Sequence, residues 1–130
     1  MAYRIRMLNR MVTSIYDEEL AKAGLKISQF SVLVAVIERE KSKPKELAAV
    51  LQMDESTLSR NVERMCARGW LKLEPEIEDR RSHVITITDK GKAMVLKAYP
   101  GWQKAQAETV RQLGEDGVSA VRSAVRKLRR

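Results

Sequence analysis

The sequence is poor in the residues from which catalytic and metal sites are most often built. Its 130 residues include one cysteine, Cys66, and one histidine, His83. A single cysteine excludes both an intramolecular disulfide and a cysteine-rich zinc site. The sequence also contains no G-x-S-x-G motif, no glycine-rich phosphate loop and no cluster of metal ligands. It therefore predicts a protein that is not an enzyme and that carries no metal and no cofactor.

Aromatic residues and long apolar segments are also scarce. Aromatic residues make up 5% of the chain, which argues against a single-strand nucleic-acid binder, because such proteins stack bases on several exposed rings. No apolar stretch approaches the roughly 18 residues that a membrane span needs. The N-terminus has a charge every few residues and lacks the apolar centre of a signal peptide. We therefore expect a cytoplasmic protein with no membrane partner.

Positive charge, in contrast, is in excess. The formal net charge is +8 and the sequence pI is about 9.9, a balance that favours an anionic partner such as nucleic acid. The excess is uneven, because residues 93–130 contain eight basic and three acidic residues whereas residues 41–92 contain eleven and nine. A nucleic-acid site in the middle of the chain must therefore depend on how its charges are arranged.

Apolar residues recur at spacings of three and four in the first half of the chain, which predicts helices. The first helix is expected over residues 3–23 and ends at Gly24, a residue type favoured at helix ends. The second is expected to be capped by Ser28 and to run to about residue 40.

Two shorter helices follow with only "QMDEST" at their junction. Pro44 suits the first turn of a helix over residues 44–51, because proline lacks the amide proton that would be unpaired there. Asp54 is expected to cap the next helix, which runs to about residue 68. The pair has the spacing of a helix–turn–helix.

Beyond Gly69 the apolar period changes to two, which predicts a β-hairpin. Leu71 and Leu73 share one face of the first strand, and residues 82–88 form the return strand. Thr88 is expected to cap a long helix that Pro100 kinks. The segment "GEDG" then interrupts the helical pattern before a last helix.

This order of elements predicts a mainly α fold with a small β-hairpin (α+β), in a single domain over residues 1–130. A helix–turn–helix followed by a hairpin is a winged helix–turn–helix. Its second helix fits the DNA major groove, which is about 12 Å wide, and the hairpin can reach an adjacent minor groove. The pattern therefore favours sequence-specific binding of double-stranded DNA.

Two stretches, "LAAVLQMDESTLSRNVERMCARGWL" and "EDRRSHVITITDKGK", carry a resemblance to a known family. The D-R-R wing and the T-x-x-G that follow S-T-x-S-R resemble the MarR family of bacterial transcription regulators, and the resemblance covers almost the whole chain. It implies a homodimeric repressor that a small anionic aromatic effector releases from a pseudo-palindromic operator. In the family the two half-sites lie about one helical turn apart, roughly 34–36 Å.

The second helix of the pair is the expected recognition helix. Leu58 and Val62 point inward, so Arg60 can bind guanine and Asn61 adenine. Arg64 and Arg68 either contact phosphates or form salt bridges. The alternative is that this face is only a solvated polar surface. The positions expected to face DNA are Ser56, Thr57, Ser59, Arg60, Asn61 and Arg64, with Lys43 and Lys45 as phosphate anchors.

The resemblance also assigns roles on the wing. Arg81 enters the minor groove, Asp79 braces it, and Arg80 contacts a phosphate. The physical reason is that a narrow minor groove concentrates negative potential, which attracts arginine. The alternative is a surface Asp–Arg pair with little energetic weight. The acids Glu74, Glu76 and Glu78 depart from the family pattern and are expected to lower non-specific affinity.

The terminal helices are expected to form a dimer. In the family, residues corresponding to 1–27 and 93–130 interdigitate with those of a second copy, and residues 28–92 form the DNA-binding lobe. The apolar stripes at both ends agree, because a chain of this length would struggle to cover them. Alternatively, the two stripes pack on each other within one chain. The stripes comprise Ile5, Leu8, Val12, Val118, Val121, Val125 and Leu128.

Two readings remain open at this point. Tyr16, Trp70, Tyr99 and Trp102 either line an effector crevice between the lobes or pack in the core. The whole chain, alternatively, is a winged-helix protein–protein interaction module whose wing arginines contact an acidic partner. Cys66 lies one helical turn after an inward residue, which predicts a buried apolar role rather than a redox sensor.

Overall fold

The computed structural model describes residues 1–79 and 81–129. As predicted, these residues form a mainly helical fold with one two-stranded antiparallel hairpin. The elements in chain order are α1 (Ala2–Leu20), the 3₁₀ turn η1 (Ala21–Ala23), α2 (Ile27–Arg39), α3 (Pro44–Leu51), α4 (Glu55–Ala67), β1 (Leu71–Pro75), β2 (His83–Ile87) and α5 (Asp89–Leu128).

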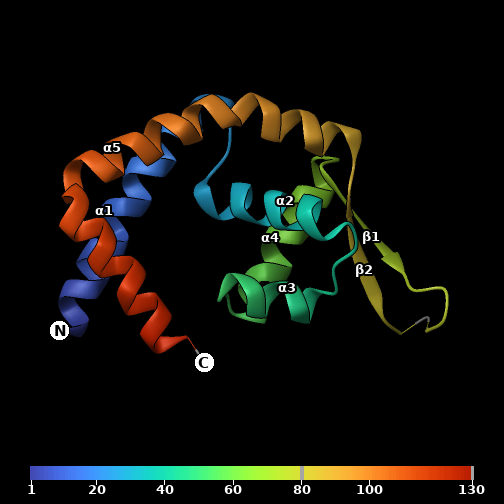
Figure 1. The fold of residues 1–130 in the computed structure, drawn as a ribbon. Coiled ribbons are helices and arrows are strands. Elements are labelled where there is room, and N and C mark those ends of the chain that lie inside the picture. The colour runs from blue at the N-terminus through green and yellow to red at the C-terminus, as the bar shows by residue number, and fades with distance from the viewer. Residues whose placement is uncertain (80, 130) are drawn as a thin grey trace.

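Helix α5 connects two parts of the molecule (Figure 1). It leaves the hairpin, passes over α2 and continues along α1. Helices α2, α3 and α4 lie with the hairpin at one end of this arch, and α1 lies with the last turns of α5 at the other. The winged helix–turn–helix is joined to the rest of the molecule by two chain connections, the one after η1 and the one into α5, and by the packing of α2 against α1 and α5.

The main hydrophobic core lies among α2, α3, α4 and the hairpin. Helix α2 supplies five buried side chains from its 13 residues. Burying a large aliphatic side chain stabilises the fold by about 1.5–3 kcal/mol, so this cluster fixes the relative positions of the four elements. The most buried members of the cluster, each at most 1% exposed, include Val32, Leu33, Val36, Leu47, Leu58, Met65 and Ile85.

Helix α2 begins earlier than the sequence predicted, and Ser28 does not cap it. The helix starts at Ile27, and the carboxylate of Asp17 accepts a hydrogen bond from the Ile27 amide at 2.8 Å. The side chain of Gln29 accepts the Lys26 amide at 3.0 Å. The first turn is thus satisfied by a carboxylate from α1, which moves the start of α2 ahead of the expected serine cap.

The turn between α3 and α4 depends on Gln52. This residue adopts a left-handed conformation with φ of 54°, and the next amide, that of Met53, donates to the carbonyl of Ala48 at 2.9 Å. Asp54 occupies the N-cap position of α4 as predicted, but its side chain makes no capping hydrogen bond. The turn is therefore held by main-chain hydrogen bonds and by the Gln52 side chain, which donates to the Ala49 carbonyl at 2.9 Å.

The segment before α3 is attached to the hairpin. Ser42 and Ile85 exchange two main-chain hydrogen bonds, of 3.2 and 2.7 Å. In the hairpin itself Leu71 faces Ile87 and Leu73 faces Ile85. Leu71 is buried, whereas Leu73 is 46% exposed although its cross-strand partner Ile85 is fully buried. The hairpin and the segment that leads into the helix–turn–helix are therefore joined by main-chain hydrogen bonds.

Helix α5 begins as the sequence predicted and is interrupted at Gly114, within the predicted "GEDG" segment, whereas Pro100, the expected kink, has no such non-helical angles. The Thr88 hydroxyl accepts a hydrogen bond from the Gly91 amide at 3.0 Å and lies 2.6 Å from the Gly69 carbonyl oxygen. Pro100 lies within α5, whereas non-helical angles occur at Gly114 (φ 72°, ψ 170°). Proline keeps a helical φ, whereas glycine tolerates a positive one, so the chain turns back at "GEDG".

The sequence predicts no membrane-spanning segment, and this depends on the length and composition of the helices. Among the described residues, no single helix is long and apolar enough to cross a membrane. Residues 2–23 and 27–39 pass the same test only as a pair bent by 76°.

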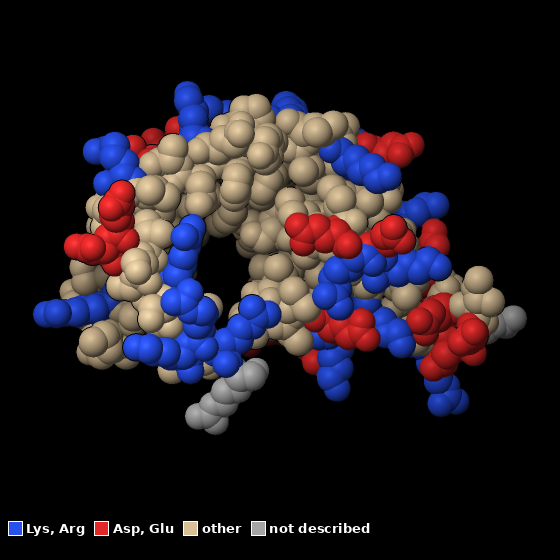
Figure 2. All heavy atoms as spheres, in the orientation of Figure 1, with Lys and Arg blue, Asp and Glu red and all other residues tan. Residues whose placement is uncertain are grey.

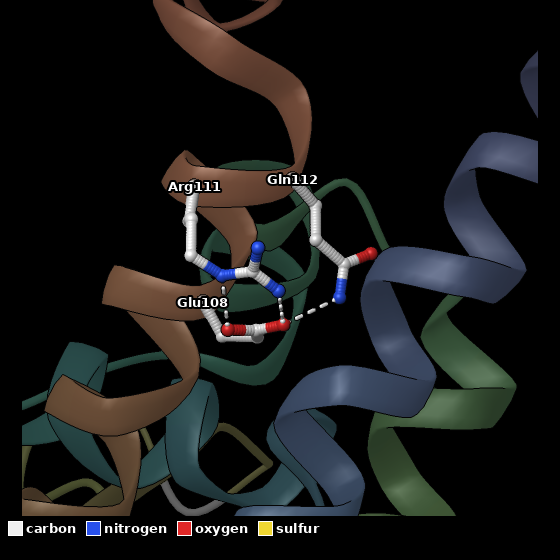
Figure 3. A network of polar contacts seen from close by, with 3 residues as sticks. All are labelled: Glu108, Arg111 and Gln112. Carbon is white, nitrogen blue, oxygen red and sulfur yellow. Dashed lines mark hydrogen bonds and ion pairs between the residues drawn. The ribbon is translucent and has the colours of Figure 1, made fainter.

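A polar network stabilises α5 just before the Gly114 break (Figure 3). The Glu108 carboxylate accepts two hydrogen bonds from Arg111, at 2.9 and 2.6 Å, and one from Gln112 at 2.7 Å. The hydrogen bonds from Arg111, and then the one from Gln112, lower the pKa of Glu108 to about 2.

We expect Glu108 to stay ionised at about pH 3, where an ordinary glutamate is mostly protonated. Because its pKa is lower in the folded state, the network stabilises the fold above the unfolded-state pKa, and this contribution is lost as the pH falls towards about 2. An NMR titration of the side-chain carboxyl carbon measures this directly. In Arg111→Ala the midpoint should rise towards the ordinary glutamate value. An ordinary midpoint in the unmodified protein would contradict the assigned network.

Candidate nucleic-acid interface

Helix α4 presents a polar face opposite its buried one. Leu58, Val62 and Met65 are buried in the core, which turns the other side of the helix to solvent. The six predicted contact positions divide into the exposed Ser56, Ser59, Arg60 and Arg64 and the half-buried Thr57 and Asn61. Arg60 and Asn61 follow each other here, so the helix offers one side chain suited to guanine and one suited to adenine.

The wing tip is organised around Asp79. Its carboxylate accepts the main-chain amide of Arg81 at 3.0 Å, and its carbonyl accepts the amide of Ser82 at 3.0 Å. The amide of Glu76 donates to the Ser82 carbonyl at 2.8 Å and closes the tip. Asp79 therefore holds the backbone of Arg81, and the Arg81 side chain is left exposed. Arg80, the predicted phosphate contact, lies outside the described residues.

Two of the three glutamates beside the wing pair with lysines. Lys43 Nζ lies 3.7 Å from the Glu76 carboxylate, and Lys72 Nζ lies 3.6 Å from that of Glu74. Lys43, Lys72 and Glu74 are exposed and Glu76 is half-buried, so each pair contributes at most about 1 kcal/mol. Lys43 therefore has a protein partner as well as a position for contacting phosphate, whereas Lys45 is exposed.

The Arg68 side chain contacts other parts of the protein. Its guanidinium carbon lies 5.0 Å from the centroid of the Trp70 ring, and its Nη1 donates to the Gly24 carbonyl at 3.5 Å. The sequence left a phosphate contact and a salt bridge open for this residue. The succession Arg68-Gly69-Trp70 is the sequence signal for this contact, because a tight turn at Gly69 brings the Trp70 ring beneath the arginine. Arg68 thus links the end of α4 to the connection before α2.

Cys66 has the properties of a small apolar residue. It is half-buried and packs against the core. Burial, and then the nearby Glu63, raise the pKa of its thiol. Because the thiolate is the reactive form, the thiol is poorly placed for redox chemistry. In residues 1–79 and 81–129, no three His, Cys, Asp or Glu side chains are grouped closely enough to hold a metal ion.

Apolar side chains at both ends of the chain remain uncovered. Ile5 is 58% exposed, Val125 55% and Leu128 82%. Val121 is also exposed, and Leu8, Val12 and Val118 are half-buried. The two stripes therefore do not cover each other within one chain, which was the alternative that the sequence left open.

The aromatic residues serve several purposes. Trp70 is buried in the core, and the Tyr16 hydroxyl donates to the side chain of Gln106 between α1 and α5. Tyr99 stacks on Trp102 with ring centroids 5.8 Å apart, and Trp102 stacks on Phe30 at 6.3 Å. Of the four residues proposed for a crevice, only Tyr99 and Trp102 form one aromatic surface.

Charge is distributed differently at the two ends of the molecule (Figure 2). Lys and Arg alternate with Asp and Glu over the winged helix–turn–helix, whereas basic residues gather at the end of α5. The basic residues that end α5 include Arg126 and Lys127. This agrees with the sequence, in which the middle segment has nearly balanced charge, so a nucleic-acid site there must depend on how its charged side chains are arranged.

Comparison with known proteins finds a family likeness for the helix–turn–helix and the first strand of the wing. A family model described as "MarR family" matches residues 23–82. The multiple antibiotic resistance protein MarR of Escherichia coli is 26% identical over 125 residues, which cover 95% of this chain and 87% of that protein.

Solved structures match the complete arrangement of elements. A mutant MarR from Escherichia coli complexed with operator DNA superposes with a TM-score of 0.88 at 25% identity, over 99% of this chain and 93% of that chain. BpsR of Bordetella bronchiseptica, whose DNA binding is regulated by 6-hydroxynicotinic acid, superposes with a TM-score of 0.88 at 23% identity. The match covers 98% of this chain and 91% of that chain and shows a shared fold.

Proposed function

The chain belongs to the MarR family, and from that premise we propose that it is a homodimeric repressor that binds a pseudo-palindromic operator in double-stranded DNA. The observation that carries the proposal is the joint placement of α4 and the wing on one unit. Ser42 and Ile85 bond the helix–turn–helix to the hairpin, so the recognition helix and the wing tip approach a duplex together. A protein-interaction module is not favoured, because the related proteins are named as transcription regulators.

Each part of this unit has a proposed role. Arg60 and Asn61 read base edges in the major groove, while Ser56, Thr57, Ser59 and Arg64 contact bases or phosphates. Arg81 enters the minor groove from a backbone held by Asp79, and Arg80 contacts a phosphate. Lys43 and Lys45 anchor the sugar–phosphate backbone. Residues 28–92 form the DNA-binding lobe in this proposal, and the protein acts in the cytoplasm.

Residues 1–27 and 93–130 form the dimerisation helices. A second copy would cover the stripes that are exposed in one chain. In the family, two lobes related by a two-fold axis meet half-sites about one turn of DNA apart. A small anionic aromatic effector would release the operator by binding more tightly to a dimer whose lobes no longer match that spacing. The stacked Tyr99 and Trp102 support a position between the lobes for such a ligand.

Selection of bound duplexes from a random pool, followed by protection footprinting of the selected sequence, tests this function. We expect a two-fold-symmetric site with two protected half-sites and an affinity that falls steeply with salt. Failure to enrich any duplex over the starting pool would exclude sequence-specific DNA binding.

The dimer is tested by placing a charge in the apolar stripe. Val125→Glu should weaken dimerisation by at least about a hundred-fold, because an unpaired carboxylate would be buried against the second copy. Sedimentation at micromolar concentration measures the change. Ser119→Glu, on the exposed opposite side of the same helical segment, provides the matched control and should remain dimeric. A monomeric unmodified protein at this concentration would refute the dimer.

A further inference from the structure

The two proposed lobes carry very different net charges. Residues 28–92, the DNA-binding lobe, contain 12 basic and 11 acidic residues, a net charge of +1. Residues 1–27 and 93–130, the dimerisation helices, contain 13 basic and 6 acidic residues, a net charge of +7. Almost all of the positive charge that favours an anionic partner therefore lies outside the lobe that carries the recognition helix and the wing.

Part of this excess is arranged along one face of the last segment of α5. Arg122, Arg126 and Arg129 follow one another at spacings of four and three, which places them within about 60° around the helix. All three side chains are exposed. The Arg129 amide donates to the Val125 carbonyl at 2.9 Å, so the helical turn extends to the last of the three. We call these three residues the arginine face.

The arginine face has no acidic partner in residues 1–79 and 81–129, where none of its side chains lies within ion-pair distance of a carboxylate. It lies about a quarter turn around the helix from the apolar stripe of Val121, Val125 and Leu128. A second copy that covers the stripe therefore leaves the arginines at the edge of the contact. Closely spaced guanidinium groups without carboxylate partners attract an anion that presents several charges in succession.

The end of α5 lies on the side of the molecule that carries the proposed DNA contacts. Figure 1 shows it along the same edge of the molecule as α3 and the wing tip, at the bottom of the view. In Figure 2, basic side chains at this end stand beside an opening that separates it from the winged helix–turn–helix. In a dimer held by the terminal helices, these helices lie between the two lobes. A duplex that spans half-sites roughly 34–36 Å apart therefore passes the end of α5.

We propose that the arginine face binds the phosphate backbone of DNA between the two half-sites. Guanidinium groups bind phosphate oxygens through paired hydrogen bonds, and such contacts add affinity for any duplex without reading its sequence. The arginine face thus supplies electrostatic attraction that a lobe of net charge +1 lacks. This inference rests on the proposed function for its partner, DNA, and for the homodimer.

The contact is tested first without an operator. Binding to a random-sequence duplex of operator length is measured by fluorescence anisotropy over a series of salt concentrations. At about 0.1 M salt, the triple variant Arg122→Gln/Arg126→Gln/Arg129→Gln should bind at least about ten-fold more weakly than the unmodified protein. Each lost phosphate contact removes about 0.9 from the slope of log affinity against log salt. We expect this slope to decrease in magnitude by at least about 2 for the dimer.

Two further variants act as controls. Lys92→Gln/Lys97→Gln/Lys104→Gln removes the same charge from exposed positions earlier in α5. It should leave the affinity within about two-fold and the slope unchanged, because charges farther than about 10 Å from a phosphate are largely screened at this salt concentration. Replacing all three arginines of the arginine face by lysine keeps the charge and should preserve most of the affinity.

Footprinting with hydroxyl radicals on the selected operator locates the contact. The unmodified protein should protect the backbone between the two half-sites, and the triple arginine-to-glutamine variant should lose this central protection while both half-sites remain protected. Central protection that persists in this variant would overturn the proposed position of the contact.

Other results would assign the arginine face differently. Equal losses of duplex affinity in the triple variant and the lysine control would mean that only the overall charge matters. A triple variant that sediments as a monomer would mean that the arginines bind the second copy. Flotation with vesicles of phosphatidylglycerol and phosphatidylcholine tests a membrane surface. Vesicle binding that is lost in the triple variant, with unchanged duplex affinity, would overturn the DNA contact in favour of lipid.

The same measurements separate this inference from the proposed function. An operator that is selected and protected at both half-sites, with the same salt slope in the triple variant, would leave the function standing and overturn the arginine contact. Random duplex that is bound through the arginine face by a protein that selects no sequence would support the contact and refute sequence-specific binding.

Discussion

Replacing Gly91 with alanine should lower the free energy of unfolding by about 3 kcal/mol, the upper part of the range for overpacking. A Cβ at this position would lie 2.2 Å from the Trp70 carbonyl oxygen and 2.8 Å from Cγ1 of Ile87. The first of these atoms belongs to the backbone that starts β1, so it cannot move by rotating a side chain. The N-terminus of α5 would have to separate from the hairpin. Urea unfolding followed by circular dichroism measures the loss.

Gly101→Ala is a graded control for this prediction. Its Cβ would lie 3.0 Å from the Glu19 carbonyl oxygen, a much milder contact. Alanine also gains about 1 kcal/mol over glycine inside a helix, so we expect a net change within about 1 kcal/mol. Equal stability of Gly91→Ala and the unmodified protein would show that the junction between β1 and α5 is not tightly packed.

Replacing Arg81 with alanine should weaken operator binding by about ten-fold or more, the order of a contact of 1–3 kcal/mol. The side chain is exposed at the wing tip, and Asp79 holds its main-chain amide at 3.0 Å. No carboxylate lies within ion-pair distance of Arg81 among the described residues, so the guanidinium is available to DNA. A mobility-shift titration at fixed salt measures the effect.

Two variants refine the role of Arg81. Arg81→Lys keeps the charge but loses the planar guanidinium, so an intermediate loss is expected if the groove recognises more than charge. Arg10→Ala removes an equal charge from the exposed surface of α1 and should leave the affinity unchanged. Circular dichroism confirms that each variant is folded. Unaltered affinity in Arg81→Ala would remove the wing from the proposed interface.

The features that sequence predicted best are those set by local chemistry. Pro44 at the start of α3, Thr88 at the start of α5 and Gly24 at the end of η1 all stand where their conformational preferences place them. The hairpin followed from a period of two, because alternation is imposed by the strand itself. The fold class was correct because these local signals and the long apolar stripes agreed.

The features that sequence missed depend on residues far apart in the chain. The capping of α2 by Asp17 required the packing of α1 against α2, and Ser28 offered a plausible local alternative. The position of Arg68 over Trp70 required the turn at Gly69 to be known in three dimensions. The proposed DNA contacts on α4 follow from its buried face. The bases that these side chains would contact cannot be derived from the protein sequence, because they belong to the operator.

The lysine–glutamate pairs beside the wing have a consequence for how binding responds to ions. Lys43 and Lys72 already carry a neutralising carboxylate in Glu76 and Glu74, which is covalently tied to the protein. A lysine that neutralises a phosphate normally releases a counterion to bulk solution, which drives non-specific binding at low salt. In the proposed interface, a phosphate at Lys43 competes with a glutamate that cannot diffuse away. A lysine paired in this way would contribute less to the salt dependence of the operator complex than an unpaired basic side chain does, and a larger share of the discrimination would fall to uncharged contacts with the bases.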